Sequence, residues 1–450
     1  MTTAQLLAFV AAVATAASQQ IGRTLSEVHP LLPSWECTVK GGCIQKNTSV
    51  VVDADFRWLQ HTVDGSSCKT DMNDGNSLNM TACPDAATCS TNCALQGAHY
   101  PDLGISTKGS ELTLTFFVNK TSGAVLAAPR VYLLSNEKSY DMFSLLNKEF
   151  TVDIDAKDLP CGTNGALFFS EMEANGGRSA VNPGGAQYGT GYCDAQCPKL
   201  PFINGEANID KHGACCAEMD IWEANSRATS FTPHPCNITG LYKCAGELCG
   251  TPNRYSSVCD RDGCDFSSYR LGQRSFYSPG PDMAIDTNRK FTIVTQFLTT
   301  TGDSTGDLHE IRRLYVQDGK VIQNAQIQVL GIDRGNSLTD NFCAQEKKTF
   351  GAVNAFGSQG GLKSMGEALR RGMVLVFCVW NDSNSAMKWL DGTWPVTADP
   401  AQDPGTGRGP CKAGEGTGED IWTNHLYTSV KFSNVKSGEI GSTYPHDTRK

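Results

Sequence analysis

Short runs of β-branched, aromatic and other apolar residues recur along this chain of 450 residues, and Gly, Asn, Asp and Pro separate them. Runs of this length bounded by turn residues are typical of β-strands. Asp318-Gly319, between two such runs, is a strong signal for a type I′ hairpin. The sequence therefore predicts an all-β protein with long connections, either a sandwich or a jelly roll. The expected strands are residues 50–53, 112–118, 130–134, 150–155, 166–172, 291–297, 311–316, 373–380 and 430–435, and the best helix candidate is 365–371.

The start of the chain and its 19 cysteines indicate export from the cell. Residues 6–14 are apolar and small residues follow up to Ser18, a pattern typical of a secretory signal peptide cleaved before Gln19. Disulfides persist in oxidising compartments. We therefore expect residues 1–18 to be a signal peptide and the mature protein to be secreted and extracellular. Five Asn-x-Ser/Thr sequons fit a glycosylated surface, at Asn47, Asn79, Asn119, Asn237 and Asn381.

Charge and composition narrow the choice of partner. The net charge is −9 and no long Lys/Arg cluster occurs, whereas nucleic acid or an anionic membrane usually calls for a basic patch. No segment after the leader has about 18 consecutive apolar residues. We expect a soluble monomer that acts on a neutral polymer. Because no linker or low-complexity tract appears, residues 19–450 are expected to form one domain without a separate binding module.

Three carboxylates stand within the six residues from Glu218 to Glu223. On an extended strand Glu218 and Asp220 share one face, but Glu223 has the wrong parity to join them. A one-residue bulge near Ile221-Trp222 would turn Glu223 to the same face, and bulges recur next to active sites. Two carboxyl groups roughly 5–5.5 Å apart are what a retaining glycoside hydrolase uses.

The alternative for this hexapeptide is a solvated acidic turn or an edge strand. Met219, Ile221 and Trp222 are large and apolar, so the strand should be at least half-buried. Carboxylates crowded on such a strand repel one another and raise a pKa, which is typical of functional sites. The pattern favours a catalytic strand.

The residues 218–225 resemble the signature of the fungal cellulases of glycoside hydrolase family 7. Further matching segments are 159–167, 188–197, 232–236 and 372–376, and the resemblance runs from about Gln19 to Tyr444. It implies a concave β-sandwich (a jelly roll) of two antiparallel sheets, whose long disulfide-tied loops form a substrate groove. The implied partner is cellulose or another β-1,4-glucan chain. No cofactor and no metal are implied.

The resemblance also assigns roles around the hexapeptide. Glu218 matches the nucleophile and Glu223 the general acid and then base of a double displacement. Asp220 would hydrogen-bond Glu218 and tune its charge, and His234 matches the histidine beside the acid/base. Without the family, His234 could equally be a lone polar residue in a Pro-rich turn.

Sugar rings stack on aromatic faces, and Trp58, Trp380 and Trp389 match platform positions of the family. A tryptophan in a β-run is otherwise more often a core residue. Phe56 and Phe168 stand where the family usually has Trp or Tyr, so stacking is kept but a hydrogen-bonding group is lost. We also expect substrate contacts from Asn164, Asp194, Gln196, Arg254, Asp262, Arg270 and Arg408.

By resemblance, nine disulfides use 18 of the 19 cysteines, a connectivity that the sequence alone leaves open. Cys378 is left over and is expected to be a buried, inert thiol. Zinc is the competing use of clustered cysteines, but the spacings form no paired C-x-x-C knuckles. The expected pairs are Cys37–Cys43, Cys68–Cys93, Cys83–Cys89, Cys161–Cys411, Cys193–Cys216, Cys197–Cys215, Cys236–Cys259, Cys244–Cys249 and Cys264–Cys343.

The family contains endoglucanases with open clefts and cellobiohydrolases with roofed tunnels. Only six residues separate Asn208 from Cys215, where cellobiohydrolases usually carry a long insertion, and this favours an endo-β-1,4-glucanase. Arg254, Arg270 and Arg408 match the product side of a cellobiohydrolase and favour a reducing-end cellobiohydrolase instead. Two rivals remain: a family 16-type β-glucanase, and a lectin-like glucan binder on the same sandwich.

Overall fold

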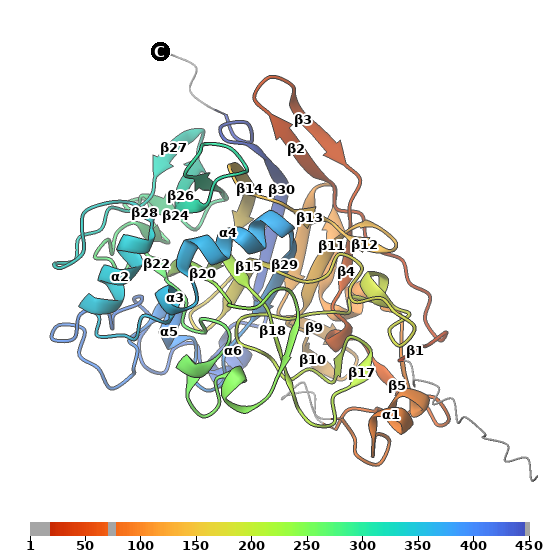
Figure 1. The fold of residues 1–450 in the computed structure, drawn as a ribbon. Coiled ribbons are helices and arrows are strands. Elements are labelled where there is room, and N and C mark those ends of the chain that lie inside the picture. Colours follow the sequence, from red (N-terminus) through yellow and green to blue (C-terminus); the bar gives the residue numbers. More distant parts are fainter. Residues whose placement is uncertain (1–18, 71–77, 446–450) are drawn as a thin grey trace, which may run out of the picture.

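Two large β-sheets stacked face to face make up the body of the computed structural model, which describes residues 19–70 and 78–445 (Figure 1). The predicted signal peptide, residues 1–18, lies outside the described residues. We call the nine-stranded sheet the inner sheet and the ten-stranded sheet the outer sheet.

The inner sheet has the order β12 (Ser139–Tyr140), β11 (Arg130–Asn136), β29 (Met373–Trp380), β15 (Asn164–Ser170), β19 (Glu218–Ala224), β20 (Thr229–His234) and β22 (Phe266–Ser267), with β4 (Ser49–Val52) on β11 and β13 (Met142–Phe143) on β29. The outer sheet has the order β27 (Lys320–Gln323), β26 (Leu308–Gln317), β25 (Phe291–Thr299), β14 (Lys148–Asp155), β30 (Ser429–Glu439), β2 (Ser34–Thr38) and β3 (Gly42–Lys46), with β28 (Ser337–Leu338), β7 (Ile105–Lys108) and β8 (Glu111–Thr115) beside it.

Short elements decorate this sandwich. The small sheets are β1 (Gln20–Ile21) with β6 (Cys93–Leu95) and β5 (Leu59–His61), β9 (Phe117–Lys120) with β10 (Gly123–Leu126), β16 (Phe202–Ile203) with β17 (Glu206–Ala207), β18 (Gly213–Cys215) with β21 (Tyr242–Cys244), and β23 (Tyr277–Ser278) with β24 (Ile285–Asp286). The helices are α1 (Ala86–Asn92), α2 (Asp340–Thr349), α3 (Ala355–Ser358), α4 (Gly361–Arg371), α5 (Lys388–Asp391) and α6 (Gly418–Asn424). No helix within the described ranges is long and apolar enough to cross a bilayer.

The predicted all-β sandwich is confirmed, and every predicted strand overlaps a strand of one of the two large sheets. The run 112–118 divides into β8 and β9, and the predicted helix is the second half of α4. Asp318 and Gly319 both have positive φ, 51° and 73°, as a type I′ hairpin between β26 and β27 requires.

The sheets are not purely antiparallel, which corrects the prediction. β2, near the start of the described chain, pairs in parallel with β30, near its end. Nearly the whole chain connects these two strands, so no hairpin fixes their relative direction.

Strand β29 shows why the inner sheet can hold a site on the face that points away from the outer sheet. All but the last of its residues are buried, because both of its faces are covered. Met373, Leu375 and Phe377 point into the core between the sheets, while Val376 and Cys378 point to the opposite face. A strand buried on both faces reads as a continuous apolar run.

All nine disulfides predicted from the family resemblance are present. Cys378 is the free cysteine, and it is buried. Burial raises the pKa of its thiol to about 12, which keeps it protonated at neutral pH.

Candidate active site

The predicted bulge is present in β19. Leu167 of β15 lies opposite Trp222, and Phe168 lies opposite Asp220, so Ile221 is the extra residue. On the other side, Asp220 pairs with Thr232 and Glu223 with Ser230, so two residues of β19 face one residue of β20. The bulge restores the parity of Glu223.

The two faces of β19 therefore separate by chemistry. Met219, Ile221 and Trp222 are fully buried in the core between the sheets. Glu218, Asp220 and Glu223 line a cleft with a volume of about 740 Å³ on the opposite face of the inner sheet, and His234 of β20 lines it with them.

Glu218 is held by the loop that two disulfides fasten to β19. Its Oε2 accepts a hydrogen bond from the backbone N–H of Ala195 at 3.1 Å. Cys193–Cys216 and Cys197–Cys215 join the loop on both sides of Ala195 to the residues just before Glu218. The N–H favours the ionised carboxylate, while the cross-links limit its movement.

Glu223 is oriented by one asparagine of β15. Its Oε1 accepts from Asn164 Nδ2 at 2.9 Å, and Asn164 Oδ1 accepts from the N–H of Ala224 at 3.0 Å. Burial, and then the charge of Asp220, raises the pKa of Glu223 to about 8. The carboxyl group is therefore protonated at neutral pH and can act as an acid.

Asp220 contacts His234 in place of the expected hydrogen bond to Glu218. Its Oδ2 lies 3.0 Å from His234 Nε2, and His234 Nδ1 donates to the carbonyl of Asp260 at 2.8 Å. Two ionised carboxylates have no proton to share, whereas the imidazole supplies one. The 3.0 Å contact places one proton between Asp220 Oδ2 and His234 Nε2, and burial, then Asp194, raises the pKa of Asp220 well above its usual range.

A fourth carboxyl group closes this acidic cluster. Asp194 accepts from the Tyr192 hydroxyl at 2.6 Å and from the N–H of Gln196 at 2.7 Å. Burial, then Asp220, then Asp194, raises the pKa of Glu218 well above its usual range. We call Asp194, Glu218, Asp220 and Glu223 the acidic cluster. Its members cannot all be ionised together at low cost, so the charge of each depends on the protonation of the others.

Further along the cleft, carboxylates are paired with arginines. Arg270 contacts both Asp265 and Glu346, and Arg408 Nη1 lies 3.5 Å from Asp265 Oδ2. Despite burial, Arg270 and then Arg408 lower the pKa of Asp265 to about 2. We call Asp265, Arg270, Glu346 and Arg408 the arginine cluster. Its fixed N–H groups suit sugar hydroxyls.

Aromatic rings line the same cleft. The rings of Trp380, at the end of β29, and Trp389, in α5, have centroids 6.1 Å apart at an interplanar angle of 34°. Phe56 and Phe168 contribute two further faces. These rings offer successive apolar surfaces to the C–H faces of a sugar chain.

Comparisons with known proteins fit this geometry. A family profile described as Glycosyl hydrolase family 7 matches residues 21–444. This chain belongs to glycosyl hydrolase family 7. A probable endo-β-1,4-glucanase of Aspergillus terreus is 49% identical over 430 residues, covering 95% of each chain.

Solved structures of family 7 proteins superpose closely on this one. A cellobiohydrolase from Daphnia pulex has a TM-score of 0.89 and 41% identity, over 94% of this chain and 100% of that one. The endocellulase EGI of Humicola insolens has a TM-score of 0.84 and 40% identity, over 95% and 100%. The family therefore includes both modes of action among structures similar to this chain.

Most predicted substrate-binding residues of this family 7 protein line the cleft. Asn164 does not, but it holds Glu223 through the hydrogen bond described above. Trp58 is 45% exposed and lies outside the cleft lining. The residues that line it as predicted are Phe56, Phe168, Asp194, Gln196, Arg254, Asp262, Arg270, Trp380, Trp389 and Arg408.

Sequence reasoning missed several cleft residues, of which Arg130 is the most constrained. Its guanidinium lies 3.4 Å from the centroid of the Tyr192 ring and pairs with Asp53 at 3.0 Å. It faces Cys378 across the β11–β29 ladder. Cys378 also lines the cleft, a position that its expected role in the core did not indicate. Tyr192, Arg261, Asp265, Lys347, Asp382 and Trp394 were missed as well.

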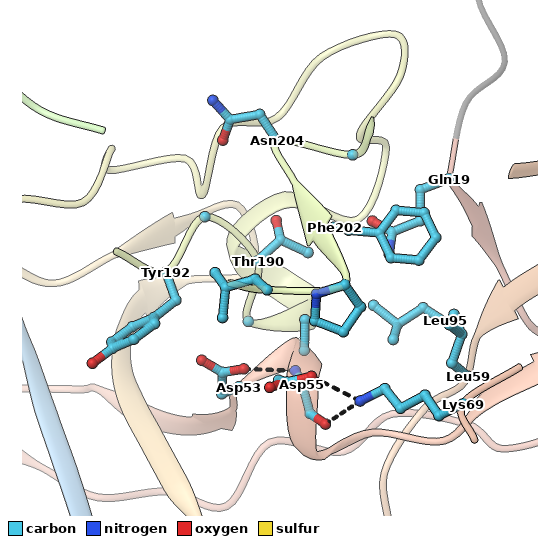
Figure 2. A pocket seen from close by; sticks show the side chains of 16 residues that line it. Gln19, Asp53, Asp55, Leu59, Lys69, Leu95, Thr190, Tyr192, Phe202 and Asn204 are labelled. Atoms are coloured by element: carbon cyan, nitrogen blue, oxygen red, sulfur yellow. Dashed lines mark hydrogen bonds and ion pairs between the residues drawn. The ribbon is translucent and has the colours of Figure 1, made fainter. Parts of the chain in front are cut away.

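A smaller hollow adjoins the cleft wall at Tyr192 (Figure 2). Its volume of about 40 Å³ holds a few water molecules rather than a sugar ring. Lys69 Nζ donates to Asp55 Oδ1 at 2.8 Å on one wall, and Asp53 beside it anchors Arg130. Asp53 and Tyr192, which line the hollow, therefore hold Arg130 in the cleft wall.

Proposed function

We propose that this family 7 hydrolase is a secreted endo-β-1,4-glucanase that cleaves internal bonds of cellulose or related β-glucan with retention of configuration. The observation that carries this proposal is the bulge at Ile221, which turns Glu218 and Glu223 to one face of β19 within one cleft. The apolar leader, the sequons and the nine disulfides support secretion. Residues 19–450 act as one catalytic domain and as a monomer.

In the first step Glu223 gives its proton to the glycosidic oxygen while Glu218 attacks the anomeric carbon. A bond forms between Glu218 and the sugar, and the bond to the leaving chain breaks. The raised pKa of Glu223 suits an acid at neutral pH. Burial and the neighbouring carboxyl groups raise the pKa of Glu218, and the N–H of Ala195 and the nearby His234 oppose that rise by favouring its ionised form.

In the second step Glu223 takes a proton from water, and the water oxygen displaces Glu218 from the sugar. The formation of the glycosyl ester removes the charge of Glu218, which lowers the pKa of Glu223 and suits it to act as a base. The Asp220–His234 pair lies beside Glu218 and keeps its proton through both steps, so the proton transfers of the reaction take place at Glu223.

Endo action is favoured by the wall of the cleft near the acidic cluster. The connection from Asn208 to Cys215 is a tight turn, in which Asn208 Oδ1 accepts from the N–H of His212 at 2.9 Å. Residues 209–214 do not line the cleft. A chain can therefore approach this region from the side. The similarity to the Aspergillus terreus endoglucanase supports the same conclusion.

A reducing-end cellobiohydrolase is the second candidate, because Arg254, Arg270 and Arg408 line the cleft. Arg254 Nη2 lies 2.5 Å from Asp262 Oδ1. Fixed arginines on one side of the scissile bond would hold a departing cellobiose. The high TM-score with the Daphnia pulex cellobiohydrolase supports this candidate.

Product analysis on carboxymethyl-cellulose separates the two. Endo action gives a fast fall in viscosity with few new reducing ends, whereas slow release dominated by cellobiose would favour the cellobiohydrolase. Glu218→Gln tests the lectin-like alternative. The variant of a hydrolase loses nearly all hydrolysis and still binds cello-oligosaccharide, whereas a lectin shows no hydrolysis in either form.

A further inference from the structure

One buried arginine from the outer sheet reaches across the core to the bulge of the catalytic strand. Arg313 of β26 is 1% exposed. Its Nη2 donates a hydrogen bond to the carbonyl oxygen of Ile221, the extra residue of the bulge. Its Nε donates to Thr295 Oγ1 at 3.2 Å, directly opposite on β25. It lies apart from the cleft lining and so makes no substrate contact.

A further contact of Arg313 is also with the bulge. Its guanidinium lies 4.5 Å from the centroid of the Phe231 ring. Phe231 stands between Ser230 and Thr232 on β20, and is therefore the residue that Ile221 and Trp222 jointly face. Arg313 thus contacts the bulge on both of its strands, at Ile221 of β19 and at Phe231 of β20.

A cation at this place is unusual on physical grounds. Its acceptors Thr295 Oγ1 and the carbonyl of Ile221 are neutral, and so is the nearby Tyr315, while its Nη1 is buried without a hydrogen bond to any described residue. Burial lowers the pKa of Arg313 for the same reason. A buried guanidinium without a carboxylate costs stability, so an apolar residue of similar size would pack here at lower cost. The carbonyl of Ile221, displaced from the register of both ladders, is what needs a donor.

We propose that Arg313 is a positioning residue, which fixes the bulge at Ile221 and thereby holds Glu223 on the same face of β19 as Glu218. This inference rests on the proposed function, since it concerns the geometry of the proposed acid/base. Without the donor, the bulge can relax towards a regular ladder, in which Glu223 would turn away from the cleft.

The test compares Arg313→Met, which keeps most of the volume but no donor, with Arg313→Lys, which keeps a donor. We expect Arg313→Met to lower kcat on a soluble β-1,4-glucan by about 10- to 100-fold with KM within about two-fold, because small misplacements of a catalytic group cost rate rather than binding. Its alkaline pH limit should shift to lower pH as Glu223 leaves its crowded site, and Arg313→Lys should recover part of kcat.

Ile311→Ala is the matched control, since Ile311 is a fully buried residue of β26 two positions away on the same face. It should lower the melting temperature and leave kcat and the pH profile unchanged. If Arg313→Met does not fold, Thr295→Val removes the acceptor of Nε instead and should lower kcat a few-fold.

If the wild type is active and Arg313→Met has the same kcat and pH profile as the wild type, the positioning role is overturned and the proposed function stands. The same holds for Thr295→Val where that variant is used. Equal losses of kcat in Arg313→Met and Ile311→Ala would also overturn it. Inactivity of the wild type on every β-1,4-glucan overturns the proposed function and this inference with it.

Discussion

Glu223 of the acidic cluster and Asp265 of the arginine cluster line the same cleft, but their pKa values shift in opposite directions. Glu223, in the acidic cluster, has its pKa raised to about 8 by burial and by Asp220. Asp265, in the arginine cluster, is buried too, yet Arg270 and Arg408 lower its pKa to about 2. Burial alone therefore does not decide the charge of a carboxyl group in this cleft. For Asp265 the guanidinium groups of Arg270 and Arg408 outweigh burial, whereas for Glu346, which also contacts Arg270, burial still raises the pKa.

This difference suits the acidic cluster to proton transfer and the arginine cluster to substrate binding. In the arginine cluster charges are compensated before substrate arrives, so the donors are rigid and suited to holding hydroxyl groups. Among the described residues, the ion pair within the acidic cluster is the contact of His234 with Asp220, and the charge of Arg130 does not offset the burial of Asp194. The uncompensated carboxyl groups cost stability and keep protons available for transfer, a combination typical of catalytic sites.

The largest expected effect comes from removing the acid of the acidic cluster. Glu223→Gln should lower kcat on a β-1,4-glucan by about 10²- to 10⁴-fold, because the leaving oxygen no longer receives a proton. Aryl cellobiosides with good leaving groups should still form the glycosyl-enzyme, and azide should speed its turnover. Glu247→Gln, an exposed glutamate, is the control and should be fully active. A Glu223→Gln variant with wild-type kcat would show that the proton comes from another group.

The second largest effect should be a loss of folding stability when Arg270 of the arginine cluster is replaced. Arg270→Met leaves Asp265 and Glu346 buried without their main cation. The free energy of unfolding should fall by about 3–5 kcal/mol. Arg312→Met is the control, because Arg312 is half-exposed and its pair with Glu310 should contribute less than about 1 kcal/mol. Similar losses in both variants, measured by denaturant unfolding, would contradict the distinction between the clusters.

The dependence of kcat/KM on pH is a smaller effect that also tests the raised pKa of Glu223. Glu223 must be protonated in the first step, so kcat/KM should fall about ten-fold per pH unit above its pKa of about 8. The acid limb belongs to ionisation of Glu218, which must carry a charge to attack. Glu223→Gln should lose the alkaline limb and keep the acid one. An alkaline limb that persists in that variant would assign it to another residue.

Much of the site follows from the sequence because it is local. The parity of Glu218, Asp220 and Glu223 on a strand requires a bulge between the last two, and the structure has it at Ile221. The apolar residues of β19 and β29 fixed which faces are buried. The hairpin at Asp318 depends on two neighbouring residues alone.

The contacts that sequence reasoning missed join residues far apart in the chain. Arg313 and Ile221 are 92 positions apart, and Arg130 and Asp53 are 77 apart. Nothing near an arginine in the sequence shows that it lies between two sheets. The disulfide pairs likewise came from the family resemblance, since spacing leaves connectivity open. The hydrogen bond expected between Asp220 and Glu218 was wrong because Asp220 contacts His234 instead. His234 lies on the neighbouring strand β20, and the sequence does not show that it faces Asp220.

The smallest expected effect is a gain in stability from Glu218→Gln. The folded state raises the pKa of Glu218 above its ordinary value of 4.5, so the folded state binds a proton that the unfolded chain releases. The contribution of this group to stability is therefore present below about pH 4.5 and is lost as pH rises through the folded pKa. The inactive variant should melt about 1–3 °C above wild type at pH 8 and show no gain at pH 4. A lower melting temperature at pH 8 would contradict the strain assigned to the acidic cluster.

The most direct test of the account is the anomeric configuration of the first product. Proton NMR of cellopentaose hydrolysis, recorded before mutarotation, distinguishes the two anomers at the newly formed reducing end. Attack by Glu218 followed by water at the same face predicts that the β-anomer appears first. Initial formation of the α-anomer would mean a single displacement by water, and the roles assigned here to Glu218 and Glu223 would be wrong.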